Sequence, residues 1–278
     1  MSGDDRAGVL AAGIAQANVL RVRSGSTETS RDEVAVEAPL EIRVGGEVLA
    51  TTMRTPGSDI ELVAGLLLSE GILGAREELF GVEFAARSEA GVAGSGVVEV
   101  SFASARPALA ASRRGTLTSS ACGVCGRLGI DDLLRGLVPA DARVQFDTLV
   151  LGRLPAALSA AQPNFARTGG LHAAAVARGD GTLLVVREDV GRHNAVDKAL
   201  GRLLLDARLP MPEGVLVVSG RASFELVQKA AAAGLSALVS VSAPSSLAIE
   251  TAERVQLLLV GFARSGGFNV YAGRARLR

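Results

Sequence analysis

Apolar and polar residues alternate over two segments early in the chain, residues 34–44 and 47–53, which Gly45-Gly46 separates. A period of two predicts strands with one buried face, and a pair of glycines between such runs predicts a hairpin turn. The preceding residues, 1–30, are mostly small and polar and end in a run of Ser, Thr and Gly. We therefore expect a flexible leader with little order, followed by a hairpin.

A helix is expected after the hairpin. Ser58 and Glu61 are spaced as in a capping box, in which the serine caps the first turn and the glutamate reaches back to it. The helical pattern continues to about Ser69, and Gly71 predicts its end. A compact α+β unit is completed by a short helix and two strands, predicted over residues 75–80, 82–87 and 96–102.

The second half of the chain alternates between strand and helix patterns. Strands are predicted over residues 171–178, 182–187, 214–218, 236–241, 256–261 and 269–271. Helices are predicted over residues 128–137, 152–161, 191–206, 223–233 and 245–254, and residues 142–151 fit either pattern. This alternation is typical of βαβ crossovers, so the fold class is α/β, with three α/β/α layers and a mixed, largely parallel sheet. The predicted units are a leader (1–30), an N-terminal α+β domain (31–112) and an α/β domain (113–278).

The composition argues against two classes of protein. The chain has 29 basic and 29 acidic residues, whereas a general nucleic-acid binder would carry a basic excess. Mean hydropathy is +0.33, yet no stretch is long and apolar enough to span a bilayer. The N-terminus starts with acidic residues before a weak Ala/Gly run, unlike a signal peptide. We expect a cytoplasmic protein without a nucleic-acid or membrane partner.

The candidate chemistry centres on Cys122 and Cys125, the two cysteines of the chain, each followed by glycine. Neighbours that are mostly Gly, Ser and Ala favour an exposed, mobile loop over a buried structural site. Nearby cations, Arg113, Arg114 and Arg127, favour the reactive thiolate form. In a reducing cytosol such a pair is catalytic or metal-binding more often than a structural disulfide.

Three uses of the thiols stay open from the residues alone. A persulfide carrier would accept sulfane sulfur on one thiolate and offer it to an acceptor, while the second thiol relays or releases it. A dithiol oxidoreductase usually has its pair after a strand and an aromatic residue, but Gly, Ser and Thr precede this one. A zinc site would need His172 and His193 as further ligands, at a spacing unlike any compact zinc finger.

Polar or Gly-rich joints follow several strands of the second half. Ligands of α/β sheets bind beyond the carboxyl ends of strands, where helix N-termini attract anions. These joints are residues 187–194 (with Arg192 and His193), 219–225 (with Ser219, Gly220 and Arg221), 242–246 and 261–268. We expect them to receive a phosphate-bearing ligand, best matched by a nucleotide. We also expect Asp197 to hold His193 from one helical turn away.

Five segments of the chain resemble the FdhD family, the formate dehydrogenase accessory sulfurtransferases. They are Leu-Ser-Glu-Gly-Ile at 68–72, Ser-Ala-Cys-Gly-Val-Cys-Gly at 120–126, Thr-Gly-Gly-Leu-His-Ala-Ala at 168–174, Glu-Asp-Val-Gly-Arg-His-Asn-Ala-Val-Asp-Lys at 188–198, and Ser-Gly-Arg-Ala-Ser-Phe-Glu-Leu-Val-Gln-Lys at 219–229. The resemblance covers residues 33–275. It implies a sulfur carrier that takes sulfane sulfur from a cysteine desulfurase. The sulfur passes to the bis-molybdopterin guanine dinucleotide cofactor (bis-MGD) of formate dehydrogenase, where it becomes a terminal ligand of molybdenum or tungsten.

The same resemblance implies roles for particular residues. Cys122 would carry the persulfide and Cys125 would assist. The family's cofactor-binding segment falls on Phe262, Ala263, Arg264, Ser265, Gly266 and Gly267. Family members often have a second basic residue where this chain has Gly267, which leaves Arg264 as the expected phosphate contact.

The resemblance also implies a homodimer without a permanently bound cofactor and a second domain with a cytidine-deaminase-like fold. Deamination is not implied, because three alanines follow His172 in place of the glutamate that a deaminase uses as acid and base.

Overall fold

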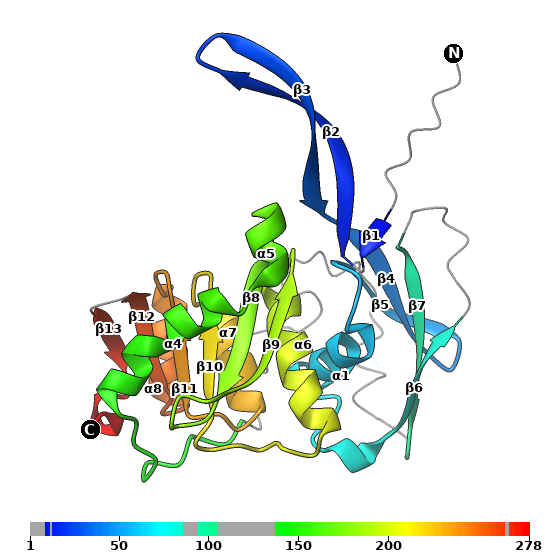
Figure 1. The fold of residues 1–278 in the computed structure, drawn as a ribbon. Coiled ribbons are helices and arrows are strands. Elements are labelled where there is room, and N and C mark those ends of the chain that lie inside the picture. The colour runs from blue at the N-terminus through cyan, green and yellow to red at the C-terminus, as the bar shows by residue number, and fades with distance from the viewer. Residues whose placement is uncertain (1–8, 12, 86–93, 105–136, 265–266) are drawn as a thin grey trace.

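The computed structural model describes residues 9–11, 13–85, 94–104, 137–264 and 267–278. They form a six-stranded sheet from the second half of the chain, a four-stranded sheet from the first half, and a three-stranded sheet that projects from the body (Figure 1). The boundary predicted between the two domains, residues 112–113, lies outside the described residues. None of the described helices is long and apolar enough to cross a membrane.

The four-stranded sheet has the order β5-β4-β7-β6, with β4 at Ala38–Val44, β5 at Glu47–Arg54, β6 at Leu79–Ala85 and β7 at Gly96–Phe102. The predicted hairpin is confirmed: β4 and β5 are antiparallel, and Gly45 and Gly46 both have positive φ angles in the turn between them. Helix α1 (Asp59–Ser69) packs against this sheet, and the short helix predicted over 75–80 is a 3-10 turn, η1 (Arg76–Glu78).

The predicted capping box of α1 is wrong. Ser58 has a left-handed backbone (φ 56°), and its side chain makes no capping hydrogen bond. Glu61 instead accepts hydrogen bonds from Nε and Nη2 of Arg187, at 2.5 and 2.8 Å. A partner in the other sheet, 126 positions along the chain, has displaced the local contact that the sequence spacing suggested.

The six-stranded sheet has the order β13-β12-β11-β10-β8-β9. Its strands are β8 (His172–Ala177), β9 (Leu183–Asp189), β10 (Val215–Val218), β11 (Ala237–Ser240), β12 (Leu258–Arg264) and β13 (Gly267–Ala272). The β10–β11 and β11–β12 pairs are parallel, whereas β8–β9, β8–β10 and β12–β13 are antiparallel. The sheet is mixed, as predicted, but it is not largely parallel. Short connections join β8 to β9 and β12 to β13, and strands joined in this way pair antiparallel.

Helices cover both faces of this sheet, which confirms the three layers. Side chains alternate along β10, so Val215 and Val217 pack towards α4 (Thr148–Ala160), and Leu216 and Val218 pack towards the opposite face. That opposite face is covered by α6 (Arg192–Leu205), α7 (Phe224–Ala232) and α8 (Ser246–Arg254) (Figure 1). The segment that fitted either pattern contains the start of α4, where Asp147 accepts hydrogen bonds from two backbone N–H groups.

Helices α1 and α6 join the two larger sheets at a close crossing. A Cβ atom at Gly65 of α1 would lie 1.9 Å from the backbone oxygen of Asp197, and one at Gly201 of α6 would lie 1.8 Å from that of Glu61. Only glycine at both positions lets the two backbones approach this closely.

The expectation of little order over residues 1–30 is wrong from Ile14 onwards. Strand β2 (Ile14–Arg23) and strand β3 (Ser26–Ala35) form an antiparallel ribbon whose turn contains Gly25 at φ 86°. Strand β1 (Val9–Ala11) pairs with the start of β2. The segment forms strands because Val, Leu and Thr recur along it and favour extended backbone. Its many polar residues obscure this strand pattern in the sequence.

Candidate functional site

The polar joints singled out in the sequence meet at one edge of the six-stranded sheet, here called the carboxyl edge. Strands β10, β11 and β12 run in the same direction and end there. Strand β8 runs the opposite way, with Ala174 opposite Val218, so its first residue, His172, reaches the same edge. The prediction that these loops lie together is confirmed.

Hydrogen bonds join the loops of the carboxyl edge to one another. Ser240 Oγ donates to the carbonyl oxygen of Gly220 at 2.7 Å, and the N–H of Ser242 donates to Ser240 Oγ at 3.2 Å. Ser219 Oγ accepts a hydrogen bond from the N–H of Ala173 at 2.9 Å. The backbone at this edge is therefore held in place by the protein itself, which favours a preformed binding site.

A pocket of about 920 Å³ opens between the carboxyl edge, α4 and α5 (Pro163–Thr168). Its lining includes four residues that the sequence analysis had selected: His172, Ser219, Ala263 and Arg264. The remaining lining residues are mostly small or apolar and come from residues 155–171 and Val241. A pocket of this kind, largely apolar with a few polar groups, is typical of small-molecule sites.

His172 lines this pocket, and the pKa of its imidazole is lowered there. Its ring is half-buried, and burial lowers its pKa, as do the positive charge of Arg192 and its neighbour His193. The negative charge of Asp189 raises the pKa of His172, but by less than the other causes lower it. The ring also lies against the joint after β10, since a Cβ atom on Gly220 would be 3.4 Å from Nδ1 of His172.

Arg192 and His193 form the first turn of α6, beside the pocket. The Nε atom of Arg192 is buried and has no hydrogen-bond partner within the described part of the chain. His193 is buried, with Nε2 3.7 Å from a carboxylate oxygen of Glu225 and 3.5 Å from Ser223 Oγ. This hydrogen bonding to His193 lowers the pKa of Glu225 to about 2. Arg192 thus offers a cationic group with hydrogen-bonding capacity to spare.

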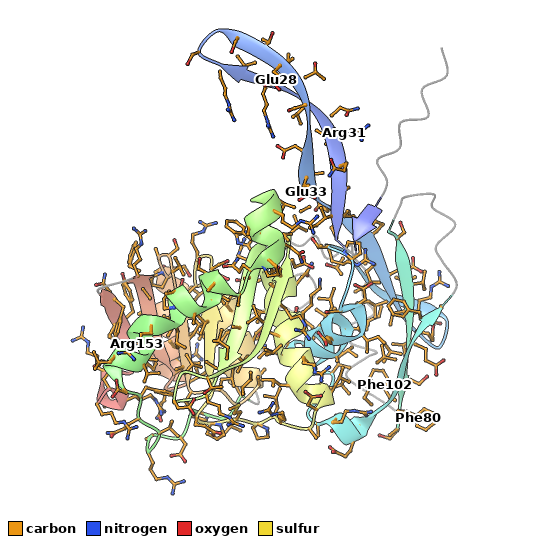
Figure 2. All side chains as sticks on the ribbon, in the orientation of Figure 1. Glu28, Arg31, Glu33, Phe80, Phe102 and Arg153 are labelled. Atoms are coloured by element: carbon orange, nitrogen blue, oxygen red, sulfur yellow. The ribbon has the colours of Figure 1, made fainter. Side chains whose placement is uncertain are left out.

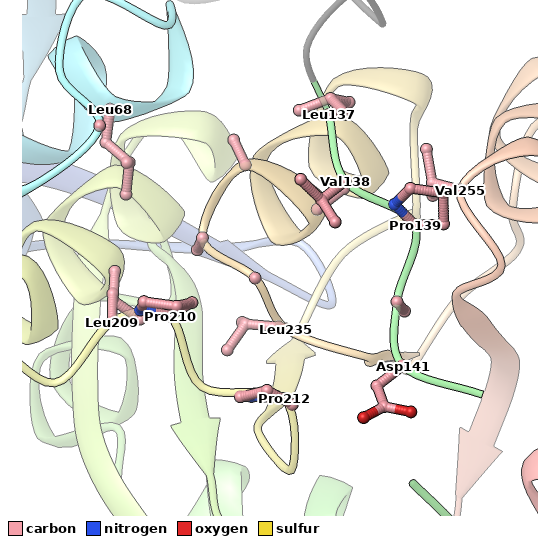
Figure 3. A pocket seen from close by; sticks show the side chains of 16 residues that line it. Leu68, Leu137, Val138, Pro139, Asp141, Leu209, Pro210, Pro212, Leu235 and Val255 are labelled. Carbon is pink, nitrogen blue, oxygen red and sulfur yellow. The ribbon is translucent and has the colours of Figure 1, made fainter. Parts of the chain in front are cut away.

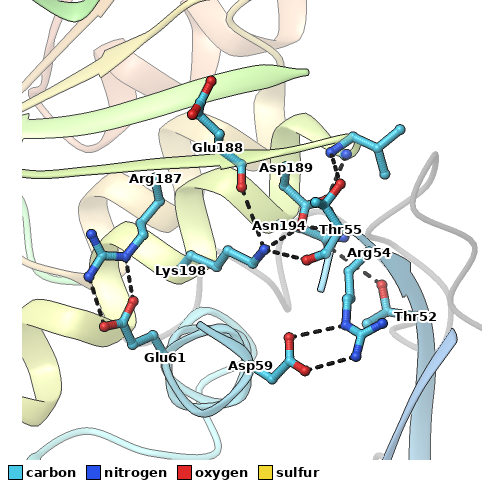
Figure 4. A network of polar contacts seen from close by, with 12 residues as sticks. Thr52, Arg54, Thr55, Asp59, Glu61, Arg187, Glu188, Asp189, Asn194 and Lys198 are labelled. Atoms are coloured by element: carbon cyan, nitrogen blue, oxygen red, sulfur yellow. Dashed lines mark hydrogen bonds and ion pairs between the residues drawn. The ribbon is translucent and has the colours of Figure 1, made fainter. Parts of the chain in front are cut away.

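The first turn of α6 is held by a buried polar network (Figure 4). Oδ1 of Asp189 accepts hydrogen bonds from the N–H of Gly191 (2.8 Å) and from Nδ2 of Asn194 (3.1 Å). Oδ2 of the same carboxylate accepts from the N–H of Thr55 (3.1 Å) and pairs with Lys198 Nζ (2.7 Å). The sequence motif at 188–198 does not by itself reveal these positioning roles, because Thr55 is remote in the chain.

The predicted contact between Asp197 and His193 is replaced by other partners. Lys229 Nζ donates to both carboxylate oxygens of Asp197, at 2.8 and 2.9 Å, and Ser69 Oγ donates to one of them at 2.8 Å. Asp197 therefore connects α6 with α7 and α1, while Glu225 is the carboxylate beside His193.

The predicted cofactor segment continues the carboxyl edge after β12. Phe262 is 42 % exposed and has a left-handed backbone at φ 52°, a conformation that costs a non-glycine residue about 1–2 kcal/mol. Arg264 is exposed, and Gly267 has open space around its Cβ position. A strained backbone with an exposed aromatic side chain next to a pocket is a feature of functional sites.

The predicted site residues fall into three groups. Ser219, Ala263 and Arg264 line the pocket with His172. The other described site residues lie in the adjoining turns and strands, and they are Arg192, His193, Gly220, Arg221, Phe262 and Gly267. Outside the described residues lie Cys122, Cys125, Arg113, Arg114, Arg127, Ser265, Gly266 and residues 128–136 of a predicted helix. The described residues contain no group of three His, Cys, Asp or Glu side chains that could hold a metal ion. The zinc alternative, which needs both cysteines, stays a prediction.

A second pocket, of about 390 Å³, lies at the opposite edge of the sheet, before β10, β11 and β12 (Figure 3). Leucine, proline, valine and alanine side chains dominate its lining, and its carboxylate, Asp141, pairs with Arg143 at 2.7 Å. It contains none of the residues selected from the sequence, so the carboxyl edge is the better candidate.

The chain is similar to known proteins over nearly its whole length. The chain is 48 % identical over 267 residues to the sulfur carrier protein FdhD of Nocardia farcinica, covering 95 % of each chain. It is 47 % identical over 266 residues to that of Streptomyces avermitilis, covering 93 % of this chain and 94 % of the other. A solved structure described as a formate dehydrogenase accessory protein, from Desulfotalea psychrophila, has a similar fold. Its TM-score is 0.74 at 24 % identity, over 95 % of this chain and 98 % of that one. The FdhD/NarQ family model matches residues 35–278, and with relatives this similar over nearly the whole chain, the protein belongs to the FdhD/NarQ family.

Proposed function

We propose that this protein is a sulfur carrier for formate dehydrogenase. It accepts sulfane sulfur from a cysteine desulfurase as a persulfide on Cys122 and delivers that sulfur to bis-MGD, which it binds as a substrate. The observation that carries the proposal is the pocket at the carboxyl edge, which His172, Ser219 and Arg264 line. The names of the relatives, which are sulfur carrier proteins, support the sulfur chemistry.

The residues around the pocket fit a phosphate-bearing ligand. Arg264 is exposed at the pocket, and its side chain makes no hydrogen bond or ion pair with another described residue, so its guanidinium is available to an anion. Arg192 supplies a second cation, whose buried Nε has no hydrogen-bond partner among the described residues. Arginine matches phosphate oxygens better than lysine does, because its planar group can donate two parallel hydrogen bonds. A volume of about 920 Å³ suits a nucleotide portion of the cofactor.

The sulfur chemistry uses both cysteines. The thiolate of Cys122 attacks the outer sulfur of the desulfurase persulfide, a new S–S bond forms, and the electron pair of the broken bond leaves with the donor cysteine. Cys125 acts only at delivery, after the cofactor is bound: its thiolate attacks Sγ of Cys122, a disulfide forms between the two cysteines, and the outer sulfur leaves as hydrosulfide. The protein binds its cofactor substrate only transiently, works in the cytoplasm, and has the desulfurase and the formate dehydrogenase catalytic subunit as partners.

Intact-mass spectrometry after incubation with a cysteine desulfurase and cysteine tests the proposal. We expect one added sulfur atom in the wild-type protein, which a reductant removes. Cys122→Ala should abolish the addition, and Cys125→Ala should retain it. A protein that gains no sulfur and instead holds zinc, lost in Cys122→Ala, would favour the metal-site alternative. A disulfide that forms and cycles without any prior addition of sulfur to the protein, and that requires both cysteines, would favour the dithiol oxidoreductase.

A further inference from the structure

Helix α5 forms one wall of the pocket at the carboxyl edge. Gln162, its N-cap residue, and Phe165, in its first turn, both line the pocket. Residues three positions apart in a helix are neighbours on one face, so a polar amide and an aromatic ring lie side by side on this wall. The sequence analysis selected neither residue, because it placed the ligand at the joints that follow strands.

The carboxamide of Gln162 has no partner in the described part of the chain. Gln162 is 7 % exposed, and its side chain neither caps α5 nor makes a hydrogen bond with another described residue. A carboxamide offers N–H donors and a carbonyl acceptor, and leaving these groups buried without partners is costly. Since Gln162 lines the pocket, a bound ligand is the partner that reaches this amide.

Phe165 supplies a flat apolar surface beside the amide. It is 43 % exposed, and the lining near it is aliphatic, with Pro155, Leu158 and Leu171. Aromatic side chains of this kind stack on planar heterocycles. A flat ligand that stacks on Phe165 presents its edge to the neighbouring side chains, and Gln162 is the polar one that α5 contributes to the lining.

Two contacts hold α5 in place before any ligand arrives. The Glu188 carboxylate accepts hydrogen bonds from the N–H groups of Asn164 (3.0 Å) and Phe165 (2.7 Å). Arg167 donates two hydrogen bonds to Glu33, at 2.8 and 2.5 Å, and Figure 2 shows Glu33 at the base of the β2–β3 ribbon beside α5. A wall that is already rigid loses little conformational freedom on binding, which favours affinity.

We propose that Gln162 and Phe165 form a subsite for a planar heterocycle whose edge has a hydrogen-bond donor next to an acceptor. The inference rests on the proposed function and names the part of bis-MGD that enters. Guanine and pterin share such an edge, a ring N–H beside a C=O group. The carboxamide N–H donates to that C=O, its oxygen accepts from the ring N–H, and Phe165 covers the ring face. Arg264, also in the lining, contacts the phosphate end.

Isothermal titration calorimetry on the full chain tests the amide with two nucleotides. Purine riboside 5′-diphosphate has the rings and phosphates of GDP but lacks the N–H and C=O edge. We expect the wild-type protein to bind GDP about tenfold more tightly than this analogue. Gln162→Met, which keeps the side-chain length and removes the amide, should raise the GDP Kd about tenfold and leave the Kd of the analogue unchanged.

The ring of Phe165 is tested with the same two nucleotides. Phe165→Ala should raise both Kd values about tenfold, and Phe165→Trp should restore them, because tryptophan also stacks. The matched control is Phe80→Ala on β6, which removes a ring that is 79 % exposed and distant from α5 (Figure 2), and it should leave both Kd values unchanged. Circular dichroism checks that each variant is folded.

A third probe, 6-hydroxymethylpterin, distinguishes the two sources of the edge. We expect guanine to be the ligand, so that Gln162→Met weakens GDP binding. A pterin that binds the wild-type protein and binds Gln162→Met more weakly, with an unchanged GDP Kd, would assign the subsite to the pterin half of the cofactor. If neither probe binds folded Gln162→Met more weakly than the wild type, or if Phe165→Ala loses no affinity, the proposal is overturned.

The sulfur-loading measurement keeps this inference separate from the proposed function. A protein that gains sulfur on Cys122 but shows no effect of Gln162→Met would retain the proposed function and lose the subsite. A protein that gains no sulfur but loses affinity in Gln162→Met would retain the subsite and lose the proposed function.

Discussion

Lys198 Nζ lies 2.7 Å from Asp189 Oδ2, and both side chains are almost fully buried. The pair also connects the two larger sheets, because Lys198 donates to the carbonyl oxygen of Thr55 at 2.7 Å and Asp189 accepts from the N–H of the same residue at 3.1 Å. Thr55 directly follows β5 of the four-stranded sheet, and Asp189 ends β9 of the six-stranded sheet. The geometry of the candidate site thus depends on a contact between the two halves of the chain.

Removing the cation of this pair should destabilise the protein strongly. Lys198→Met leaves the Asp189 carboxylate buried without its countercharge, and we expect the free energy of unfolding to fall by about 3–5 kcal/mol. The double variant Asp189→Asn/Lys198→Met should recover part of that loss. Urea unfolding measures each value. Arg202→Met is the control: its ion pairs with Asp206 (2.9 Å) and Glu61 (3.7 Å) are made by a half-exposed arginine, so its removal should change the free energy of unfolding little. Equal losses in Lys198→Met and Arg202→Met would contradict this account.

The pair between His193 and Glu225 should make stability sensitive to acid. The pKa of Glu225 is lowered from 4.5 to about 2 in the folded protein, chiefly by hydrogen bonding to His193. A lowered carboxyl pKa contributes stability that is present above about pH 4.5 and is lost as the pH falls towards about 2. We expect Glu225→Gln to lower stability at neutral pH by about 2 kcal/mol, allowing for partial exposure, and to flatten its decline over that window. Urea midpoints between pH 2 and pH 7 test it, and parallel curves for the two proteins would argue against the pair.

Local sequence patterns predicted the strands and turns well where short-range interactions decide the structure. The strand over 96–102 has the predicted bounds, and the hairpin turns at Gly45-Gly46 as predicted. Both features depend on the alternation of apolar residues and on glycine conformation within a few neighbouring residues. The convergence of the joints at 219–225 and 242–246 also followed, since strands that share a direction end at one edge.

Long-range partners decide the features that sequence patterns missed. Glu61 binds Arg187 rather than the start of its own helix, and Asp197 binds Lys229 and Ser69. No spacing rule connects residues that are 126 or 128 positions apart. The order of the ribbon escapes prediction for a different reason. Its polar composition indicates disorder, whereas its Val, Leu and Thr residues favour strands.

The α1–α6 crossing should tolerate no side chain at its glycines. In Gly65→Ala the new Cβ would overlap the backbone oxygen of Asp197, so the helices must separate, and we expect a loss of about 2 kcal/mol or more. Gly152→Ala is the matched control, a helical glycine in α4 whose added Cβ would meet only an atom of Phe268, at 3.9 Å. That change should be neutral or stabilising by up to about 1 kcal/mol. Thermal unfolding distinguishes the two, and similar melting temperatures would contradict the packing argument.

The charge of Arg192 should hold the imidazole of His172 in its neutral form. Burial is the largest cause of the lowered pKa of His172, and Arg192 is the next. We therefore expect the pKa of His172 to rise in Arg192→Ala and to stay below 6.5, because burial remains. The chain has two histidines, so NMR titration of the ring protons is tractable, with His193→Gln assigning the signals. A pKa that falls or does not move would show that the guanidinium lies elsewhere in solution.

Arg264 should be the phosphate contact of the pocket. It is an exposed cation on the pocket wall, and the neighbouring position 267 is glycine, so no second basic side chain from that position can replace it. With GDP as the probe, we expect Arg264→Ala to raise the Kd about tenfold, which corresponds to about 1.4 kcal/mol and to the loss of one charge-assisted hydrogen bond. Arg153→Ala is the control, because this exposed arginine of α4 is not part of the pocket lining. Isothermal titration calorimetry at two salt concentrations measures both. A Kd that is unchanged in Arg264→Ala but raised in Arg192→Ala would move the phosphate to the first turn of α6, where the buried Nε of Arg192 is the alternative donor.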